Sequence, residues 1–124
     1  MVIGMRTLSA AQADDVRQAL RAAERRCALR FALFLGSPVG GRRHFAERLH
    51  AALDEEADDA VVIMVDVRGR ALEIVTGENA RRRLSDASCR LTAMSMATAF
   101  SAGDLVGGLL YGIGALAEQA GARR

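Results

Sequence analysis

Two apolar runs at fixed places in the chain constrain the fold more than any other feature of the sequence. The first is LRFALFL, residues 29–35, with Gly36 and Pro38 directly behind it. The second is VVIMVDV, residues 61–67. Runs of this length, apolar at successive positions and bounded by turn residues, are typical of strands buried on both faces. The sequence therefore predicts a sheet with helices on both of its sides.

The segment between these two runs predicts a helix, because residues 42–53 carry Phe45, Leu49 and Leu53 at a spacing of four. A helix that connects two strands of one sheet implies a right-handed crossover and parallel strands. The next strand, RALEIVT at residues 70–76, follows a short turn at Arg68 and Gly69. It is expected to return antiparallel to the second strand, which makes the sheet mixed.

Helical patterns occupy both ends of the chain. Ser9 and Gln12 have the spacing of a capping box before an amphipathic helix over residues 10–26. A second helix is expected over residues 87–100, capped by Ser85 or Asp86, and a third over residues 102–121, capped by Ser101. Glycine costs up to about 1 kcal/mol per helical site. We expect close packing against a neighbouring element to offset that cost in the last helix.

The resulting order of elements is α-β-α-β-β-α-α. With strands paired as above and helices left for both faces, the expected fold class is α/β. The expected architecture is a three-layer α/β/α sandwich with a small mixed sheet. A chain of 124 residues is near the commonest domain size, so residues 1–124 are expected to form a single domain.

The composition excludes several classes of function. All 17 basic residues are arginine, so Schiff-base chemistry and the lysine of a phosphate-binding loop are excluded. A net charge of +2 and an aromatic content of 4% argue against a nucleic-acid partner. Residues 1–8 lack the apolar run of an export signal, which favours a cytoplasmic location. Residues 91–117 carry a single charge, Asp104, whose insertion into a bilayer would cost about 3 kcal/mol. We therefore interpret that stretch as two buried helices rather than a transmembrane segment.

The cysteines and histidines do not suggest a reactive centre. Cys27 and Cys89 are too few for a disulfide framework, so they are expected to be reduced, buried thiols. His44 and His50 lie six positions apart, on different faces of the expected helix. They cannot chelate one metal ion as an i, i+4 pair does, and we expect both on the surface.

A glycine-rich loop after the first strand is a candidate anion site. GSPVGGRR, residues 36–43, has the G-x-x-x-x-G spacing of a phosphate loop, but arginine replaces the lysine and the Mg²⁺-binding hydroxyl. Nucleotide hydrolysis is therefore not expected. The free N–H groups near Gly40 and Gly41, together with Arg42 and Arg43, could hold a phosphate or sulfate. The alternative is a turn with solvated arginines.

Two further charge runs have simpler interpretations. DEEADD, residues 54–59, is predicted to be a solvated acidic loop, because it lacks the glycine and ligand spacing of a calcium loop. Arg81, Arg82 and Arg83 are predicted to be a solvated run. The open alternatives for the arginines are an anion patch, a contact with an acidic partner, or pairing with residues 54–59 in a homodimer.

Several phrases of the sequence resemble one known family. They are Leu8-Ser9, FLG at residues 34–36, FAERL at residues 45–49, LEIVTG at residues 72–77, LSDA at residues 84–87 and FSAGDLVGGLLYGIGALAE at residues 100–118. In this order they resemble the TPM domain, named for a thylakoid lumen protein, a photosystem repair protein and a modulator of levamisole receptors. The chain is most similar to the small actinobacterial branch of unknown function, and its arginine- and alanine-rich composition fits a high-GC genome.

The resemblance implies the same sandwich fold. In some members it implies divalent-metal binding, with calcium or magnesium, and acid phosphatase activity; other members resemble interaction or modulator domains. This chain departs from the family in three respects. Residues 1–7 hold no acid, Leu105 follows Gly103 and Asp104 where the family often has Tyr, and no leader or anchor is evident. Fewer carboxylates mean fewer oxygen ligands for a hard cation.

Asp104 is the residue with the clearest candidate role. At the start of the last helix, a carboxylate meets unpaired N–H groups and the positive end of the helix dipole, so its role is structural in one interpretation. In the other, Asp104 is a metal-site acid, with Asp66 and Glu73 as helpers. Because no nucleophile–base pair is evident, no catalytic residue is assigned. We favour a non-catalytic binding or interaction domain with an unknown protein partner; the alternative is a divalent-metal-dependent phosphatase.

Overall fold

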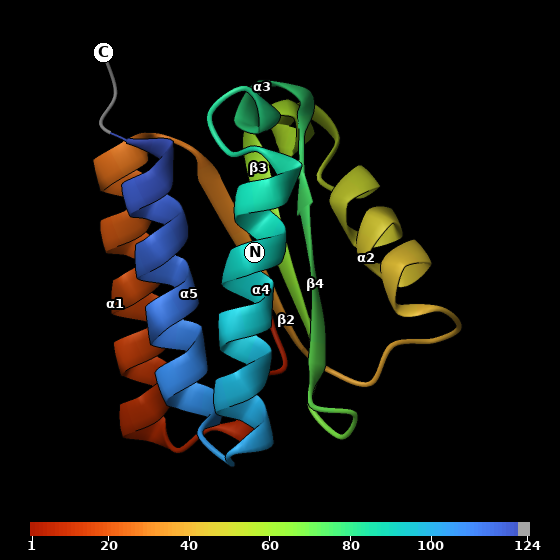
Figure 1. The fold of residues 1–124 in the computed structure, drawn as a ribbon, viewed down its shortest axis with the longest axis vertical. Helices are drawn as coiled ribbons and strands as arrows, with labels where there is room; N and C mark the ends of the chain where they lie inside the picture. Colours follow the sequence, from red (N-terminus) through yellow and green to blue (C-terminus); the bar gives the residue numbers. More distant parts are fainter. Residues whose placement is uncertain (122–124) are drawn as a thin grey trace.

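A mixed sheet separates two unequal layers of helices (Figure 1). This computed structural model describes residues 1–121. One face of the sheet is covered by α1 (Ala10–Cys27), α4 (Asp86–Ser101) and α5 (Leu105–Ala120), and the other by α2 (Arg42–Ala51). The predicted α/β/α sandwich is thereby confirmed.

The sheet has four strands in the order β1-β2-β3-β4. They are β1 (Val2–Ile3), β2 (Arg30–Gly36), β3 (Ala60–Asp66) and β4 (Ala71–Thr76). The two apolar runs pair in parallel, with Leu33 opposite Ile63, and β4 returns antiparallel to β3, as predicted. The sequence analysis missed β1, which pairs in parallel with β2. Two residues are too few to show any hydrophobic period.

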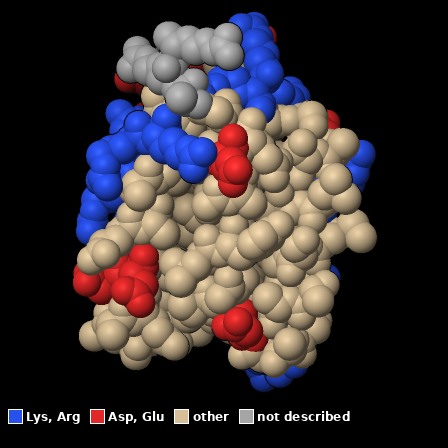
Figure 2. All heavy atoms as spheres, turned by 60° about the vertical axis from the view of Figure 1, so that its left-hand side comes forward, with Lys and Arg blue, Asp and Glu red and all other residues tan. Residues whose placement is uncertain are grey.

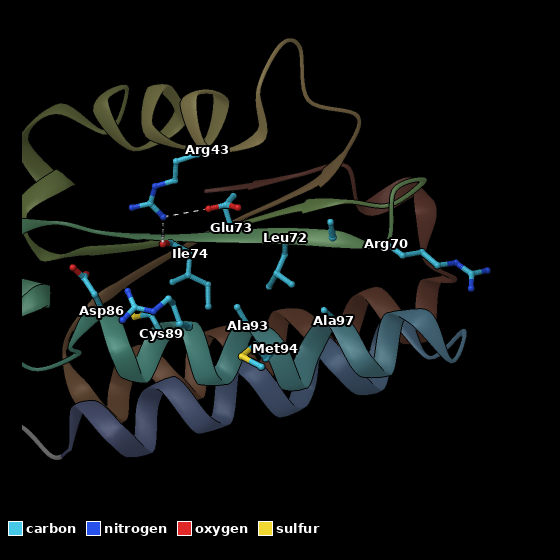
Figure 3. Close-up of a pocket in the computed structure, with 12 residues that line it drawn as sticks. Arg43, Arg70, Leu72, Glu73, Ile74, Asp86, Cys89, Ala93, Met94 and Ala97 are labelled. Atoms are coloured by element: carbon cyan, nitrogen blue, oxygen red, sulfur yellow. Dashed lines mark hydrogen bonds and ion pairs between the residues drawn. The ribbon is translucent and has the colours of Figure 1, made fainter.

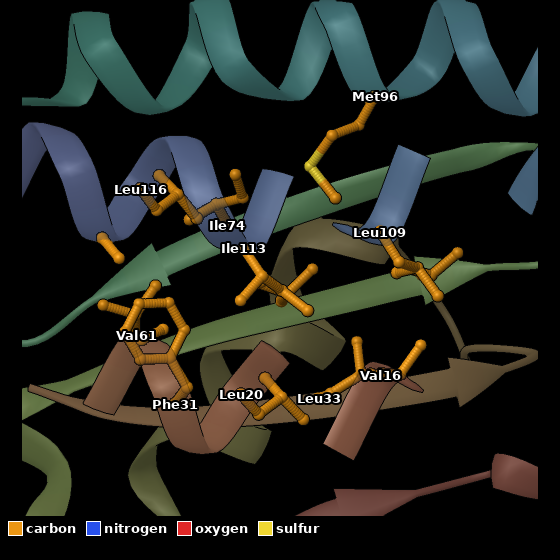
Figure 4. Close-up of a cluster of buried hydrophobic side chains, with 14 of the residues drawn as sticks. Val16, Leu20, Phe31, Leu33, Val61, Ile74, Met96, Leu109, Ile113 and Leu116 are labelled. Carbon is orange, nitrogen blue, oxygen red and sulfur yellow. The ribbon is translucent and has the colours of Figure 1, made fainter. Parts of the chain in front are cut away.

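The two faces of β3 belong to different hydrophobic cores. Val61, Ile63 and Val65 join the large cluster under α1, α4 and α5 (Figure 4). Val62 and Met64 join the small cluster under α2. Because successive side chains of a strand point to opposite faces, an uninterrupted apolar run is what a strand buried on both sides requires.

The helix starts depend on side-chain caps. In α1 the predicted capping box is confirmed: Ser9 Oγ accepts from the Gln12 N–H (3.1 Å) and Gln12 Oε1 accepts from the Ser9 N–H (3.0 Å). The predicted start of α5 was wrong. Ser101 is the last residue of α4, and Asp104 caps α5. Gly103 has a φ of 84°, a left-handed conformation that glycine adopts without strain, and it separates the two helices.

Glycines let α4 and α5 approach each other closely. A Cβ atom added to Gly108 would lie 2.6 Å from Phe100 Cε1, and one added to Gly112 would collide with the sulfur of Met96. The expectation of close packing is confirmed at these two positions. It fails at Gly114, where a Cβ would meet nothing within 4 Å.

The acidic run is more structured than predicted. Residues 54–59 form a 3₁₀ helix, η2 (Asp54–Asp59), rather than a loop, although the acids are exposed as expected. A further 3₁₀ helix, η1 (Met5–Thr7), follows β1. His50 is partly buried rather than superficial, because its Nε2 lies 2.8 Å from the Ala57 carbonyl oxygen of η2.

The three consecutive arginines differ in role: Arg81 and Arg82 are exposed, as predicted, whereas Arg83 is partly buried. Arg81 is the last residue of a short helix, α3 (Glu78–Arg81), and the other two arginines come directly after it. Arg81 donates to the Thr76 carbonyl at 2.9 Å, whereas Arg82 forms an exposed pair with Glu78. Arg83 donates to the carbonyls of Cys27, Ala120 and Gly121. The backbone carbonyls that end β4, α1 and α5 are the partners that the sequence could not reveal.

Candidate binding groove between β4 and α4

A cavity lies between the outer strand of the sheet and helix α4, and we call it the β4–α4 groove (Figure 3). Its volume is about 590 Å³. One wall follows the length of β4 and the other follows α4 at helical spacing. The lining residues are Arg43, Arg70, Ala71, Leu72, Glu73, Ile74, Asp86, Cys89, Arg90, Ala93, Met94 and Ala97.

The middle of the groove is apolar and its borders are charged. Ala93, Met94 and Ala97 face Leu72 and Ile74 across it (Figure 3). Arg43 reaches over from α2, donating from Nη1 to the Ile74 carbonyl at 2.9 Å and approaching Glu73 Oε1 at 3.4 Å. At the opposite end Arg70 donates to the Ser101 carbonyl at 3.0 Å. The groove therefore offers an apolar surface flanked by arginines and two carboxylates.

The one thiol that lines the groove is poorly suited to nucleophilic chemistry. Cys89 is 6% exposed. Burial raises the pKa of its thiol, nearby Asp86 adds to the rise, and Arg43 opposes it. The thiolate is the nucleophile, so a thiol with a raised pKa is unreactive at neutral pH. No histidine is among the lining residues to act as its base. Cys89 is therefore not expected to act as a nucleophile.

The candidate anion-site arginines are engaged by acids and by the backbone. Arg42 Nε lies 2.9 Å from Asp66 Oδ2, and Arg43 contacts Glu47, Glu73 and the Ile74 carbonyl. Gly41 is the N-cap of α2, with no side chain to cap the helix. Gly40 has a φ of 78°, which only glycine adopts readily, so the loop conformation itself explains this residue. Carboxylates of the chain itself therefore already pair with the two guanidinium groups that a phosphate would need.

The structure does not gather the three candidate metal ligands. Asp66 ends β3, and its oxygens accept from Arg42 and, at 3.0 Å, from the Gly69 N–H. The Gly69 hydrogen bond, with help from Arg42, lowers the pKa of Asp66 against a smaller opposing effect of burial. Glu73 lies in β4 beside Arg43. Within residues 1–121 no three His, Cys, Asp or Glu side chains could hold one metal ion, so these acids do not fit a calcium site.

Asp104 acts as a helix cap. Its Oδ1 accepts from the Gly107 N–H at 2.9 Å, as the structural interpretation of the sequence expects. Asp66 lines a second cavity, of about 190 Å³, together with Gly103 and Leu105 on either side of Asp104 in the chain. Glu73 lines the β4–α4 groove instead. The fold therefore brings Asp66 to the neighbourhood of Asp104 but directs Glu73 elsewhere.

Sequence reasoning missed the α4 wall of the groove. Cys89, Ala93 and Ala97 recur at a spacing of four, and Met94 extends the same face. The prediction of this helix rested on its cap and did not use the pattern. The available signal was that Met94 and Leu91 are apolar but lie outside the buried stripe of the helix. In the structure each is 66% exposed. An outer strand adjacent to that helix was also needed, and the sequence did not show which strand would be outermost.

The helical face of the molecule has a broad uncharged centre, with separate acidic patches around it and arginines gathered mainly at the upper left (Figure 2). Asp104 is the only charged residue between Arg90 and Glu118. Leu91 and Tyr111 are its large exposed apolar side chains. In the part of the chain that the structure describes, every helix is too short or too polar to cross a membrane.

Comparison with known proteins places the chain in a family. Residues 6–117 match the family described as Domain of unknown function (DUF5130). The chain belongs to the DUF5130 family. Uncharacterised proteins of Mycobacterium tuberculosis strains CDC 1551 and H37Rv are each 34% identical to it over 97 residues. This DUF5130 chain aligns over 77% of its own length but over only 56% of theirs.

Three solved structures share the fold of this DUF5130 domain. The N-terminal domain of a protein from P. gingivalis has a TM-score of 0.82 at 20% identity, covering 95% of this chain and 79% of that one. The BA42 protein of Bizionia argentinensis has a TM-score of 0.83 at 19% identity, covering 94% and 86%. The N-terminal domain of a Corynebacterium glutamicum protein reaches 0.78 at 12% identity, covering 99% and 80%. At these identities the likeness concerns the fold alone.

Proposed function

We propose that this DUF5130 domain is a non-catalytic interaction module that binds a polypeptide segment of another protein in the β4–α4 groove. The observation that carries the proposal is the groove itself, an apolar channel of about 590 Å³ that follows an outer strand of the sheet. Concave apolar surfaces with a few charged groups at the border are typical of binding sites. A protonated, buried Cys89 supports binding rather than covalent chemistry.

The chemistry of the groove favours a protein over a nucleic acid. No aromatic side chain is among its lining residues, so bases would have no stacking surface. As parts of the same proposal, we place the domain in the cytoplasm and in the TPM domain family. The resemblance of the sequence phrases between Leu8 and Glu118 supports the second point. A homodimer through the same groove is the competing arrangement.

A divalent-metal-dependent phosphatase of the TPM type has less support. It requires several free carboxylates around one cation, whereas Asp66 and Glu73 are each paired with an arginine. Its test is hydrolysis of a generic phosphate ester with added calcium or magnesium. Turnover that disappears in Asp104→Ala would replace our proposal with that function.

The groove is tested by two matched substitutions on one helix. Met94 lines the groove and Leu91 does not, yet both lie on α4 with 66% exposure. Peptides are first selected from a displayed random library on the wild-type chain. Met94→Arg should weaken their binding about tenfold or more, equivalent to about 1.4 kcal/mol. Leu91→Arg should leave the Kd unchanged.

Two outcomes would contradict the proposal. One is that the library yields no peptide with measurable affinity. The other is that Met94→Arg and Leu91→Arg affect the Kd equally, because binding would then lie on the helical face rather than in the groove. Circular dichroism of both variants establishes that each is folded before the Kd values are compared.

A further inference from the structure

The outer position of β4 leaves backbone hydrogen-bonding groups without a strand partner. β4 is the last strand of the sheet, with β3 on one side only. The Gly77 N–H donates to the Ala60 carbonyl, just beyond the pair Thr76–Val61. In an antiparallel pair, bonded positions alternate along the strand. The groups of Glu73 and Val75 therefore point to β3, and those of Leu72, Ile74 and Thr76 point outward, beside the groove.

Two arginines confirm this direction and protect the edge. The Ile74 carbonyl accepts from Arg43 Nη1, and the Thr76 carbonyl accepts from Arg81 Nη2, each at 2.9 Å. A carbonyl that receives a side chain from outside the sheet faces away from β3. Capping of edge groups by charged side chains is a known way to prevent uncontrolled strand pairing. Both caps are side chains, which a competing backbone can displace.

The groove and the edge form one continuous surface. Leu72 and Ile74 line the groove with their side chains while their backbone groups form the outer edge of the sheet. A strand placed beside β4 would direct alternate side chains towards Ala93, Met94 and Ala97 (Figure 3). Its remaining side chains would face Arg43 on the α2 side.

From this geometry we infer, on the basis of the proposed function, that the occupant of the groove is an extended strand of a partner protein that pairs with the edge of β4. Main-chain hydrogen bonds to Leu72 and Ile74 supply the register, and pockets for alternate side chains supply the selectivity. The strand carries apolar residues towards α4. It carries an Asp or Glu where Arg43 is displaced from the Ile74 carbonyl.

The excess of positive charge at the border of the groove favours an acidic partner. Arg43, Arg70 and Arg90 outnumber Glu73 and Asp86 around the groove. Arg90 is exposed at the border, on the same helix as Met94. When a backbone N–H of the partner donates to the Ile74 carbonyl, Arg43 loses its own hydrogen bond to that carbonyl. Its guanidinium stays paired with Glu73 and can also bind a carboxylate of the partner. A charge-assisted bond of this kind is stronger than a neutral one.

The test uses a selected peptide of about eight residues, the length of an ordinary strand. The whole chain is titrated with the peptide and with a copy methylated at alternate backbone nitrogens, which cannot donate to the edge. We expect the methylated copy to bind about tenfold or more weakly. We also expect the bound peptide to slow hydrogen exchange at the Leu72 and Ile74 amides. Arg90→Glu should weaken an acidic peptide and leave a neutral analogue unaffected, whereas Arg48→Glu, outside the groove, should change neither.

The results separate this inference from the proposed function. Equal binding of methylated and unmethylated peptides, together with loss of binding in Met94→Arg, would overturn strand pairing. The proposed binding of a peptide in the groove would remain supported. Binding that survives Met94→Arg would overturn both. Slow exchange at Leu72 and Ile74 that depends on protein concentration, without any peptide, would overturn the partner strand in favour of a second copy of this chain.

Discussion

At the scale of single residues, Arg83 makes three side-chain hydrogen bonds, all of them to backbone carbonyls. Its Nη1 lies 2.6 Å from the Cys27 carbonyl oxygen, its Nη2 lies 2.6 Å from that of Gly121, and its Nε lies 3.2 Å from that of Ala120. These carbonyls end α1 and α5, where the helix dipoles are negative. One guanidinium therefore caps two helices and joins their ends.

Arg83→Ala should destabilise the protein far more than the neighbouring Arg82→Ala. A hydrogen bond from a charged donor contributes about 1.5–3 kcal/mol, so loss of three should lower the free energy of unfolding by about 3 kcal/mol or more. Arg82 is paired only with Glu78 at the surface, and such pairs contribute about 0–1 kcal/mol. Urea unfolding of both variants measures the difference. Equal losses would contradict the capping role.

Asp66 should make stability depend on acid pH. Its pKa is lowered in the folded chain by the Gly69 N–H and by Arg42. Near pH 4 the unfolded state therefore binds more protons than the native state, and stability falls as the pH decreases through the folded pKa. Asp66→Asn should flatten this fall, since asparagine keeps the Gly69 hydrogen bond but not the charge.

The measurement is the free energy of unfolding from pH 7 to pH 2 for the wild type and for Asp66→Asn. Asp15→Asn is the control, because it removes the same charge from an exposed position on α1. An identical pH dependence in wild type and Asp66→Asn would contradict the assignment.

The sequence places Asp66 in an apolar strand, but it does not show the partner of that carboxylate. A carboxylate in an apolar strand had to reach water or find a partner, and both occur: Asp66 ends β3 and contacts Arg42. The partner is 24 positions away, so its identity depends on the crossover and not on any local pattern. The same is true of Arg83, whose partners lie 37 to 56 positions away.

At the scale of elements, two glycines of α5 should respond in opposite ways to alanine. Gly112→Ala places a methyl group against Met96, and overpacking of this kind costs about 1–3 kcal/mol. Gly114 faces open space, so Gly114→Ala should stabilise the helix by about 0.5–1 kcal/mol. Thermal unfolding of the two variants gives the signs directly. A stabilised Gly112→Ala would show that α4 and α5 are not held by this contact.

The long elements were predictable because each has a strong period and a recognisable cap. The predicted bounds of α1, β2 and β3 agree with the structure to within about a residue, as expected for boundaries. The exceptions are elements without such signals. β1 and α3 are too short for a period, and the start of α5 depended on a choice between two good caps, Ser101 and Asp104.

At the scale of the whole molecule, calcium should not stabilise this chain. The carboxylates of Asp66, Glu73 and Asp104 are already bonded to arginines or to a helix N-terminus. A cation that binds only the native state would raise the melting temperature, and residues 1–121 hold no cluster of three metal-ligating side chains, so we expect no rise. For the wild type and for Asp104→Asn, we expect each protein to unfold at the same temperature in millimolar calcium as in chelator.

A rise in calcium for the wild type alone would identify Asp104 as a metal ligand after all. It would then restore the metal site that the family resemblance implies. Asn also caps helices well, so Asp104→Asn should lose only the charge–dipole contribution of about 0.3–1 kcal/mol.

The order of elements was enough to predict the layers, but not the groove. The sandwich follows from a crossover helix, a hairpin and amphipathic helices, all of which are visible in the sequence. The β4–α4 groove arises from the position of β4 at the end of the sheet and from the distance at which α4 packs over it. Neither quantity is a property of any single segment such as residues 71–76 or 86–101.

The side-by-side packing of α1 and α5 has a consequence for how this chain is made (Figure 1). The β3–β4 and α4–α5 pairs join neighbours in sequence and can form locally, whereas α1 must wait for a helix that begins at Leu105. Closing so long a loop adds little free-energy cost, since that cost grows with the logarithm of length, but distant contacts slow folding. On the ribosome, the apolar stripe containing Val16 and Leu20 is made early and stays without its α5 cover until the last helix has emerged.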